Sequence, residues 1–254
     1  MGKIIAVSNQ KGGVGKTSTA INLAYGLSEK GKKVLLCDID SQGNATTGLG
    51  VNKGSLDRSV YDVIMGEADC KQTIIKTQFK NLYLLPSHMD LAGAEVELVP
   101  MKHREKRLAN ALAEIKDEYD YIILDCPPAI SLLTVNGLAA ADGVLIPIQS
   151  EYYALEGLAQ LMNTIKLVKK GLNPSLEIEG VLITMYDKRA LVTRQICDEI
   201  RKFFGNRVYQ TVIPRNIRVS EAPSHGVPLM VHDKKCKGSV AYYQFTEEFL
   251  GRNK

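Results

Sequence analysis

Residues 3–20 read KIIAVSNQKGGVGKTSTA, which is a short apolar run, a glycine-rich loop and the start of an amphipathic helix. Gly12, Gly13 and Gly15 allow backbone amides to approach an anion without obstruction by a Cβ atom. The helix that begins near Lys16 directs the positive end of its dipole at the same point. A strand, a loop of this kind and a helix, in this order, predict a phosphate-binding site.

The rest of the chain continues this alternation of short apolar runs and helical patterns. The apolar runs occupy residues 3–8, 33–38, 81–86, 121–128, 143–148, 177–185 and 207–214. The helical patterns occupy residues 17–30, 131–141, 154–170 and 191–204. Continuously apolar strands separated by helices are typical of a parallel sheet that is covered on both faces. We therefore predict a doubly wound, mostly parallel α/β fold of the P-loop NTPase type.

Composition limits the class of protein. The 254 residues, of which 45% are hydrophobic and 24% charged, suffice for one large domain over residues 1–254. No run of eighteen apolar residues occurs and the first ten residues do not resemble a signal peptide, so we expect a cytoplasmic protein. Five scattered cysteines without a CxxC pair predict reduced, structural thiols. The net charge of +4 is compatible with a local basic face and indicates no partner by itself.

The glycine-rich loop is a variant of the common phosphate-binding pattern. Lys16 is expected to neutralise the β and γ phosphates, and the Thr17 hydroxyl to ligate magnesium. A dinucleotide-binding GxGxxG loop is disfavoured, because Ser18 stands where its third glycine would be. The usual GxxxxGK[ST] pattern fails at its first glycine, which here is Gln10. A glycine-rich turn that binds nothing is the alternative interpretation.

KGGVGKT, residues 11–17, resembles the deviant Walker A motif of the ParA/MinD family of dimeric ATPases. In that family the early lysine reaches across a dimer interface to phosphates that the other subunit binds. The resemblance implies an ATP-dependent homodimer in which Lys11 takes part in catalysis. It also implies nucleotide contacts along the loop, from Lys11, Gly12, Gly13, Val14, Gly15, Lys16, Thr17 and Ser18. Without the rest of the family pattern, Lys11 could equally be a solvated loop lysine.

The segment DIDSQGN, residues 38–44, resembles the family's DxDPQGN, with Ser41 in place of the proline. By this resemblance Asp40 is the hydrolytic residue, and Asp38 is a second candidate for the magnesium shell. Both follow an apolar run beside the loop, where one carboxylate can position water and another can support the metal. Acidic residues at a strand end also commonly form turns, which is the alternative for each.

Three later segments extend the resemblance over nearly the whole chain. YIILDCPPA, residues 121–129, matches a Walker B strand whose Asp125 would hold magnesium, through a water; a buried turn aspartate is the alternative. QSEYYALEGL, residues 149–158, resembles the segment after the next strand. TVIPRNIRVSEAPSHG, residues 211–226, resembles the loop near the adenine, from which Pro214 and Asn216 are carried over as base contacts.

Two branches of the family fit the sequence poorly. Electron-transfer relatives such as the nitrogenase iron protein need cluster-ligating cysteines, and Cys126 has no companion motif. MinD proteins attach to membranes through a basic amphipathic C-terminal helix, whereas Glu247 and Glu248 interrupt the corresponding segment here. We expect that helix to pack Tyr243, Phe245 and Phe249 into the fold, and we expect no membrane partner.

The remaining branch binds DNA. Basic residues recur in the second half of the chain without a zinc-finger or helix-turn-helix pattern, which favours contacts to phosphates irrespective of sequence. Resemblance to Soj proteins favours Arg189 and Arg218, each of which could also be a solvated surface charge.

The resemblance thus implies a ParA/Soj-type ATPase for chromosome or plasmid segregation that needs ATP and Mg²⁺ and associates with the nucleoid. Its Mg-ATP dimer would bind nonspecific double-stranded DNA, and a ParB-like partner would stimulate its slow hydrolysis and release it. One alternative is a MinD-like or other protein-positioning ATPase. Another is a regulatory scaffold that binds nucleotide without hydrolysing it.

Overall fold

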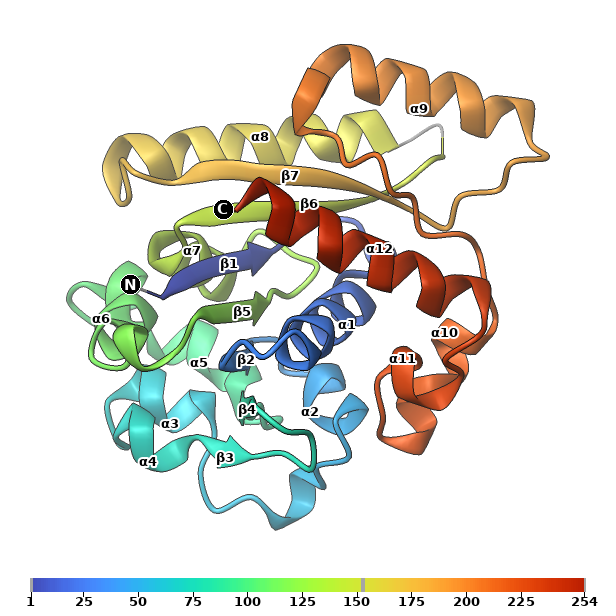
Figure 1. The fold of residues 1–254 in the computed structure, drawn as a ribbon. Helices are drawn as coiled ribbons and strands as arrows, with labels where there is room; N and C mark the ends of the chain where they lie inside the picture. The colour runs from blue at the N-terminus through green and yellow to red at the C-terminus, as the bar shows by residue number, and fades with distance from the viewer. Residues whose placement is uncertain (1, 152–153, 254) are drawn as a thin grey trace.

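In the computed structural model, which describes residues 2–151 and 154–253, seven strands form a sheet in the order β3-β4-β2-β5-β1-β6-β7 (Figure 1). The strands are β1 (Lys3–Val7), β2 (Val34–Asp38), β3 (Ile75–Lys76), β4 (Leu82–Leu85), β5 (Tyr121–Asp125), β6 (Gly143–Gln149) and β7 (Glu177–Thr184). All neighbouring pairs are parallel except β3 with β4. The predicted doubly wound, mostly parallel sheet is confirmed.

The position of β1 creates the crevice expected in such a sheet. β1 lies between β5 and β6, yet the chain runs from β1 to β2, on the far side of β5. Connections therefore leave the carboxyl ends of the central strands in opposite directions, and ligands bind at such a switch point. The loop after β1 and the last residues of β2 and β5, Asp38 and Asp125, meet there.

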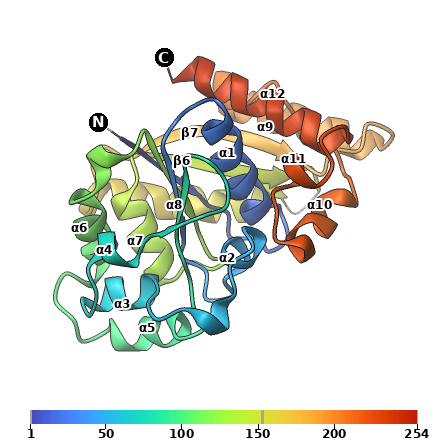
Figure 2. The same cartoon turned by 60° about the horizontal axis from the view of Figure 1, so that its bottom comes forward.

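Helices cover both faces of the sheet (Figure 1). One face carries α1 (Lys16–Glu29), α11 (Leu229–His232) and α12 (Lys237–Arg252). The other carries α3 (Val60–Met65), α5 (Leu91–Glu97), α6 (Arg107–Ala113), α7 (Leu132–Ala140), α8 (Ala154–Gly171) and α9 (Leu191–Phe204). The remaining α-helices are α2 (Asn44–Gly48), α4 (Cys70–Thr73) and α10 (Arg218–Glu221). The rotated view in Figure 2 separates α1, α11 and α12 from α7 and α8.

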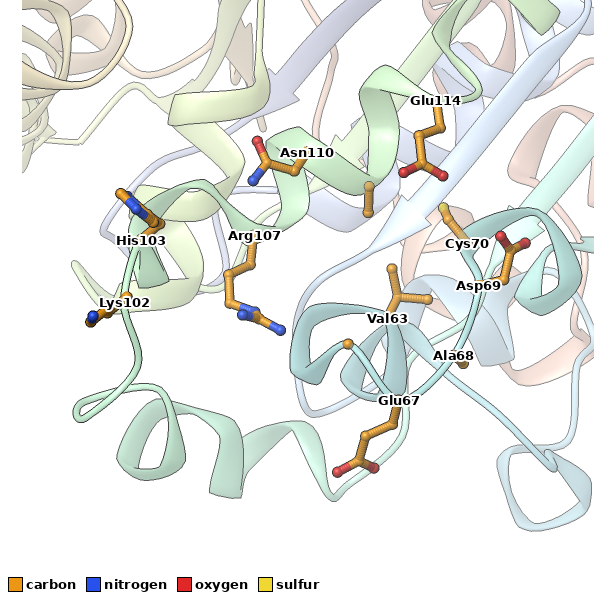
Figure 3. A pocket seen from close by; sticks show the side chains of 12 residues that line it. Val63, Glu67, Ala68, Asp69, Cys70, Lys102, His103, Arg107, Asn110 and Glu114 are labelled. Carbon is orange, nitrogen blue, oxygen red and sulfur yellow. The ribbon is translucent and has the colours of Figure 1, made fainter.

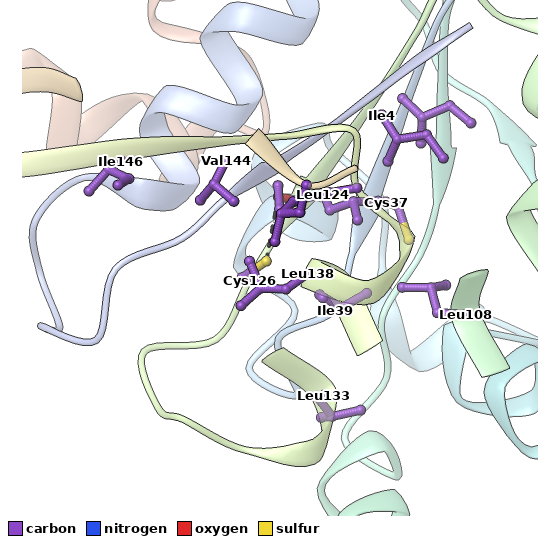
Figure 4. Close-up of a cluster of buried hydrophobic side chains, with 14 of the residues drawn as sticks. Ile4, Cys37, Ile39, Leu108, Leu124, Cys126, Leu133, Leu138, Val144 and Ile146 are labelled. Atoms are coloured by element: carbon purple, nitrogen blue, oxygen red, sulfur yellow. Dashed lines mark hydrogen bonds between the residues drawn. The ribbon is translucent and has the colours of Figure 1, made fainter. Parts of the chain in front are cut away.

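Alternate residues of each central strand enter the two cores. Ile4 of β1 packs on the α7 side, whereas Ile5 packs on the α1 side. Figure 4 shows part of the first core, where Leu124, Leu138 and the Cys126 thiol meet. Burial raises the pKa of this thiol, so Cys126 stays protonated and packs as a small apolar group. Burial of each of these leucines contributes about 1.5–3 kcal/mol to the free energy of folding. The core therefore stabilises the strands whose carboxyl ends form the switch point.

The prediction of a strand at residues 207–214 is wrong. This segment follows β7 but pairs with it at separate points. The Tyr209 amide donates to the Val181 carbonyl at 2.9 Å, the Ile213 amide donates to the Ile183 carbonyl at 2.8 Å, and an isolated bridge joins Pro214 to Tyr186, just beyond β7. Between these points, the Glu248 carboxylate of α12 accepts the amides of Gln210 and Thr211 at 2.8 and 2.9 Å. The Glu248 side chain therefore binds backbone amides that would otherwise be available for regular pairing with β7.

The C-terminal helix packs into the fold as predicted, with one difference in its aromatic residues. Phe245 and Phe249 are fully buried, but Tyr242 is the buried tyrosine and Tyr243 is only partly buried. Glu247 forms an ion pair with Lys30, just after α1, at 2.7 Å. Within residues 2–151 and 154–253, no helix combines the length and apolar character that a membrane span requires. Tyr152 and Tyr153, in the segment matched to the family at 149–158, lie outside the described residues.

Candidate nucleotide site

A cleft of about 670 Å³ opens at the carboxyl ends of the central strands, where the phosphate-binding loop was predicted. Nine of the predicted site residues line it: Gly12, Gly13, Gly15, Lys16, Thr17, Ser18, Asp40, Pro214 and Asn216. The loop after β1 forms one end of the cleft, and residues 213–223 form the other. The topology therefore brings together segments about two hundred residues apart in sequence.

The glycines of the loop leave room for an anion. Gly13 and Gly15 have positive φ angles of 74° and 86°, which side-chain-bearing residues rarely adopt. A Cβ atom added at Gly12 or Gly13 would meet no atom within 4 Å. Gly15 precedes α1 without a side-chain cap, and the first turn of α1 contains no acidic residue. The amides of that turn are therefore available to phosphate oxygens.

Hydrogen bonds from two neighbouring strands hold the loop in place. The Asn9 side-chain amide donates to the Pro147 carbonyl at 2.7 Å, and its oxygen accepts the Lys11 amide at 3.1 Å. The Thr184 hydroxyl at the end of β7 donates to the Val14 carbonyl at 2.8 Å. The Val14 side chain is buried, and its backbone carbonyl accepts the bond that joins the loop to β7. Thr184, which sequence reasoning missed, connects the loop to the edge strand.

Lys16 is the cation inside the cleft. It is 7% exposed, and its ammonium donates to the Lys11 carbonyl at 3.2 Å. Burial lowers the pKa of Lys16, while the nearby carboxylates of Asp125 and Asp40 act in the opposite direction. Within the part of the chain that the structure describes, this long backbone contact is the one hydrogen bond of the Lys16 ammonium, so the buried cation is ready to pair with a polyanion.

Asp125 has the surroundings of a metal ligand. It is fully buried at the end of β5, and neither of its oxygens has a hydrogen-bond partner within the described residues. Burial raises the pKa of Asp125 well above its usual range, and the charge of its register partner Asp38 raises it further, while the neighbouring Thr17 hydroxyl opposes the shift. Buried carboxylates are normally paired or coordinate metals. The residues present therefore fit Mg²⁺, with Asp125 and the Thr17 hydroxyl as the groups that would hold it.

Asp38 is held quite differently from Asp125. Its Oδ2 accepts both the hydroxyl and the amide of Thr46, at 2.7 and 2.8 Å, and its Oδ1 accepts the Asp40 amide at 3.2 Å. Burial raises the pKa of Asp38 to about 6, although the bonds from Thr46 oppose the shift. Because its oxygens already bind α2 and the following loop, Asp38 organises the loop and has little capacity left for a metal.

Asp40 lies on the wall of the cleft. It is 9% exposed, and its Oδ1 accepts the Gln42 amide at 2.9 Å. Its backbone carbonyl accepts the Gly43 amide at 2.8 Å and the Ser87 hydroxyl at 2.7 Å. The carboxylate thus stands at the end of a firmly bonded turn and faces the same space as Lys16.

Lys11 is placed outside the cleft. Its ammonium forms an ion pair with Glu151, just after β6, at 2.6 Å. Its side chain is 33% exposed and that of Glu151 is 49% exposed. Such exposed pairs contribute about 0–1 kcal/mol, so another anion can readily replace Glu151 as the partner of Lys11.

The part of the lining that comes from later segments of the chain is more apolar. It includes Pro214 and Asn216 together with Met185, Ile217 and Tyr242, three residues that sequence reasoning did not select, and the Tyr242 hydroxyl lies 3.4 Å from that of Thr19 in α1. Pro214 and Asn216 could be selected from the sequence because their loop resembles that of the family. Tyr242 could not, because its surroundings in the sequence are typical of any helix that packs on a core. An apolar lining next to a polar phosphate loop suits a nucleotide base.

The two arginines predicted to contact DNA are exposed but differ in their surroundings. Arg218, at the start of α10, pairs with Glu221 at 2.7 Å and lies 3.8 Å from Asp233. Arg189 lies in the loop before α9, and no ion pair of its side chain is found within the described residues. Its backbone amide donates to the Asp187 carboxylate at 2.9 Å.

A second cavity, of about 550 Å³, lies between α3, α4 and α6. Figure 3 shows Glu67 and Asp69 on one side of it, across from Lys102, His103 and Arg107. The Arg107 guanidinium donates to the carbonyls at the end of α3, at 2.7 Å to that of Met65. Its charge therefore serves to terminate a helix, and the cavity contains none of the predicted site residues.

A phosphate-binding loop that opens a helix at the switch point of a parallel sheet defines the P-loop class of nucleotide-binding proteins, and this chain has their fold. The family model described as "AAA domain" matches residues 2–178. The chain is 54% identical over 248 residues to the sporulation initiation inhibitor protein Soj of Bacillus subtilis, with 98% of each protein covered. It is 49% identical over 253 residues to the chromosome partitioning protein ParA of Myxococcus xanthus, with 100% of this chain and 89% of that protein covered. The chain therefore belongs to the family of ParA and Soj chromosome-partitioning ATPases.

Solved structures agree with this placement. The cobyrinic acid a,c-diamide synthase of Mycobacterium smegmatis, solved with bound ADP and magnesium, superimposes with a TM-score of 0.85 at 36% identity. The alignment covers 97% of this chain and 93% of that chain. A protein with this fold thus holds the two ligands that the cleft and Asp125 fit.

Proposed function

We propose that this chain is a ParA/Soj-type ATPase that segregates a chromosome or plasmid. Mg-ATP drives two copies into a sandwich dimer, the dimer binds double-stranded DNA without sequence preference, and a ParB-like partner stimulates hydrolysis and releases it. The observation that carries the proposal is the pairing of a phosphate loop with the buried Asp125 beside Lys16. Association with the nucleoid follows from the DNA binding.

Each group in the cleft has a distinct role in this proposal. The amides of Gly13 and Gly15 and the Lys16 ammonium bind the phosphates, and Pro214 and Asn216 bind the adenine. Thr17 and Asp125 would hold magnesium, which would supply positive charge against the phosphate oxygens. Asp40 positions the attacking water. Hydrolysis by these groups alone is slow, because few donors stabilise the charge that develops on the γ phosphate.

The proposed dimer gives Lys11 its function. In the single chain its ammonium is paired with Glu151 at the rim, outside the cleft that contains Lys16. A cation at this position can contact the phosphates of a nucleotide that a facing copy binds. The nucleotide bound by the same chain is already contacted by Lys16. The weak, exposed pair with Glu151 holds Lys11 until such a partner arrives.

Lys11→Ala is expected to bind Mg-ATP within about threefold of the parent protein but to remain monomeric, since the variant lacks the group that contacts the partner's phosphates. Light scattering after size exclusion measures the dimer, and calorimetry measures the affinity. Lys30→Ala is the matched control, because Lys30 is also a partly exposed lysine in one ion pair, with Glu247. Full ATP-dependent dimers of Lys11→Ala would refute the proposed role.

DNA binding is proposed to use Arg189 more strongly than Arg218. Arg189 lies exposed in a loop, so its charge is available to a phosphate. Arg218 must first give up its contact with Glu221. A dimer presents each arginine twice, and modest charge then becomes ATP-dependent affinity.

Arg189→Ala is expected to weaken binding equally for all DNA sequences, because a phosphate contact carries no sequence information. The substitution removes two arginines from each dimer. With about 0.9 counterions released per phosphate neutralised, the slope of log affinity against log salt should flatten by about two units. Arg218→Ala should flatten it less. Anisotropy titrations at several salt concentrations measure the slope. The control is Arg58→Ala, which removes an exposed arginine just before α3, at the opposite end of the sheet from α9.

Two outcomes would count against the DNA proposal. An unchanged slope for Arg189→Ala would show that this arginine is only solvated surface. ATP-dependent dimers of the parent protein that bind no DNA at low salt would favour a protein-positioning ATPase instead.

A further inference from the structure

A buried chain of hydrogen bonds connects Asp38, at the end of β2, and Asp40, just after it, to the loop after β4. The Thr46 hydroxyl donates to Asp38 Oδ2 at 2.7 Å and accepts the Ser87 amide at 2.9 Å. The Ser87 hydroxyl then donates to the Asp40 carbonyl at 2.7 Å. Asp38, Thr46 and Ser87 are all fully buried. The chain thus begins at the sheet and ends on the backbone of the residue that faces the cleft.

The direction of these bonds is fixed by chemistry. An amide can only donate, so Ser87 must use one lone pair of the Thr46 oxygen, and the Thr46 proton is left for Asp38. The Ser87 hydroxyl has a carbonyl as its partner, so it must donate as well. Each hydroxyl therefore has one geometry that satisfies all its neighbours, and the chain resists rotation of either side chain.

We propose that Thr46 and Ser87 are positioning residues for hydrolysis, which fix the backbone of Asp40 so that its carboxylate is aimed into the cleft. The proposal rests on the proposed role of Asp40 in positioning water. Neither residue lines the cleft, so neither contacts nucleotide there. Both act through Asp40, Thr46 by holding Ser87 and Asp38, and Ser87 by holding the Asp40 carbonyl.

The structure separates this role from a general contribution to folding. The Asp40 carbonyl also accepts the Gly43 amide at 2.8 Å, so loss of the Ser87 hydroxyl leaves it bonded. Removing one such bond costs about 0.5–1.5 kcal/mol of stability, which a domain of this size tolerates. A shift of about 1 Å in a group that orients a reactant can cost about a hundredfold in rate. The rate of hydrolysis should therefore suffer more than the fold.

Ser87→Ala is expected to lower kcat for ATP at least tenfold while leaving Mg-ATP affinity and ATP-dependent dimerisation within about twofold. Steady-state release of labelled phosphate at saturating Mg-ATP measures kcat, and calorimetry measures affinity. The matched control is Ser28→Ala, because the buried Ser28 hydroxyl also donates to a backbone carbonyl at 2.7 Å, that of Tyr25, within α1. This control should retain the parent kcat.

Thr46 supplies an independent test that does not depend on Ser87. Thr46→Ser keeps the hydroxyl and should retain most of kcat, whereas Thr46→Val keeps the shape, loses the hydroxyl and should lower kcat at constant affinity. Unchanged kcat in Ser87→Ala, or equal losses of affinity and kcat in both series, would overturn the inference. Asp40→Ala is measured alongside. If this variant hydrolyses ATP normally, the proposed function of Asp40 fails. If hydrolysis is lost in Asp40→Ala but not in the Thr46 and Ser87 variants, only the positioning role of Thr46 and Ser87 is refuted.

Discussion

Lys16→Ala is expected to lower the affinity for Mg-ATP at least a hundredfold, as measured by calorimetry. Within the described residues, Lys16 is the lysine whose side chain enters the cleft, and it faces the carboxylates of Asp125 and Asp40. Its loss removes the cation opposite the phosphates and leaves two acidic groups near a polyanion. A charge-assisted hydrogen bond contributes about 1.5–3 kcal/mol, and the added repulsion acts in the same direction.

A control must show that the loss is local to the cleft. Lys116→Ala removes another largely buried lysine, which pairs with Asp142 at 2.8 Å and lies outside the cleft. It should bind Mg-ATP like the parent protein, and both variants should unfold in one cooperative transition. Near-normal affinity of Lys16→Ala would mean that the loop does not bind phosphate.

The local parts of this site could be predicted from sequence because their chemistry is contained in a few adjacent residues. Residues 3–20 carry the strand, the glycines with left-handed φ angles and the start of α1 in one stretch. The role of Asp125 could also be predicted from the sequence, because an apolar strand that ends in an acidic residue places this residue at the carboxyl edge of a parallel sheet. The order of apolar runs and helices gave the fold for the same reason.

The individual hydrogen bonds that side chains make to distant segments could not be predicted. Asp38 and Asp125 occupy equivalent places at the ends of adjacent strands, yet only Asp38 is bonded to Thr46. Nothing in the sequence next to either aspartate distinguishes them. The failed strand at residues 207–214 has a similar cause, because the acceptor for its amides is Glu248, on a different helix. Local periodicity does not record which side chain reaches a backbone from elsewhere.

Asp40→Ala is expected to bind Mg-ATP with nearly the parent affinity, to dimerise, and to lose hydrolysis by at least a hundredfold. The phosphate loop, Lys16 and Asp125 are left intact, so binding persists. The carboxylate that faces the cleft is gone, so a water near the γ phosphate has no acceptor to orient it. Labelled phosphate release measures hydrolysis, and light scattering measures the dimer. Asp57→Ala, which removes an exposed aspartate outside the cleft, should behave like the parent protein.

The outcome for Asp40→Ala also decides what the dimer does. If hydrolysis opens the dimer, dimers of this variant should persist after free ATP is removed, because the bound nucleotide is not consumed. Normal hydrolysis would assign water positioning to another group. Asp38 is then a weak candidate, because three hydrogen bonds hold its carboxylate away from the cleft. Dimers that dissociate at the parent rate without hydrolysis would instead show that nucleotide release controls the cycle, as expected of a scaffold that binds ATP and does not turn it over.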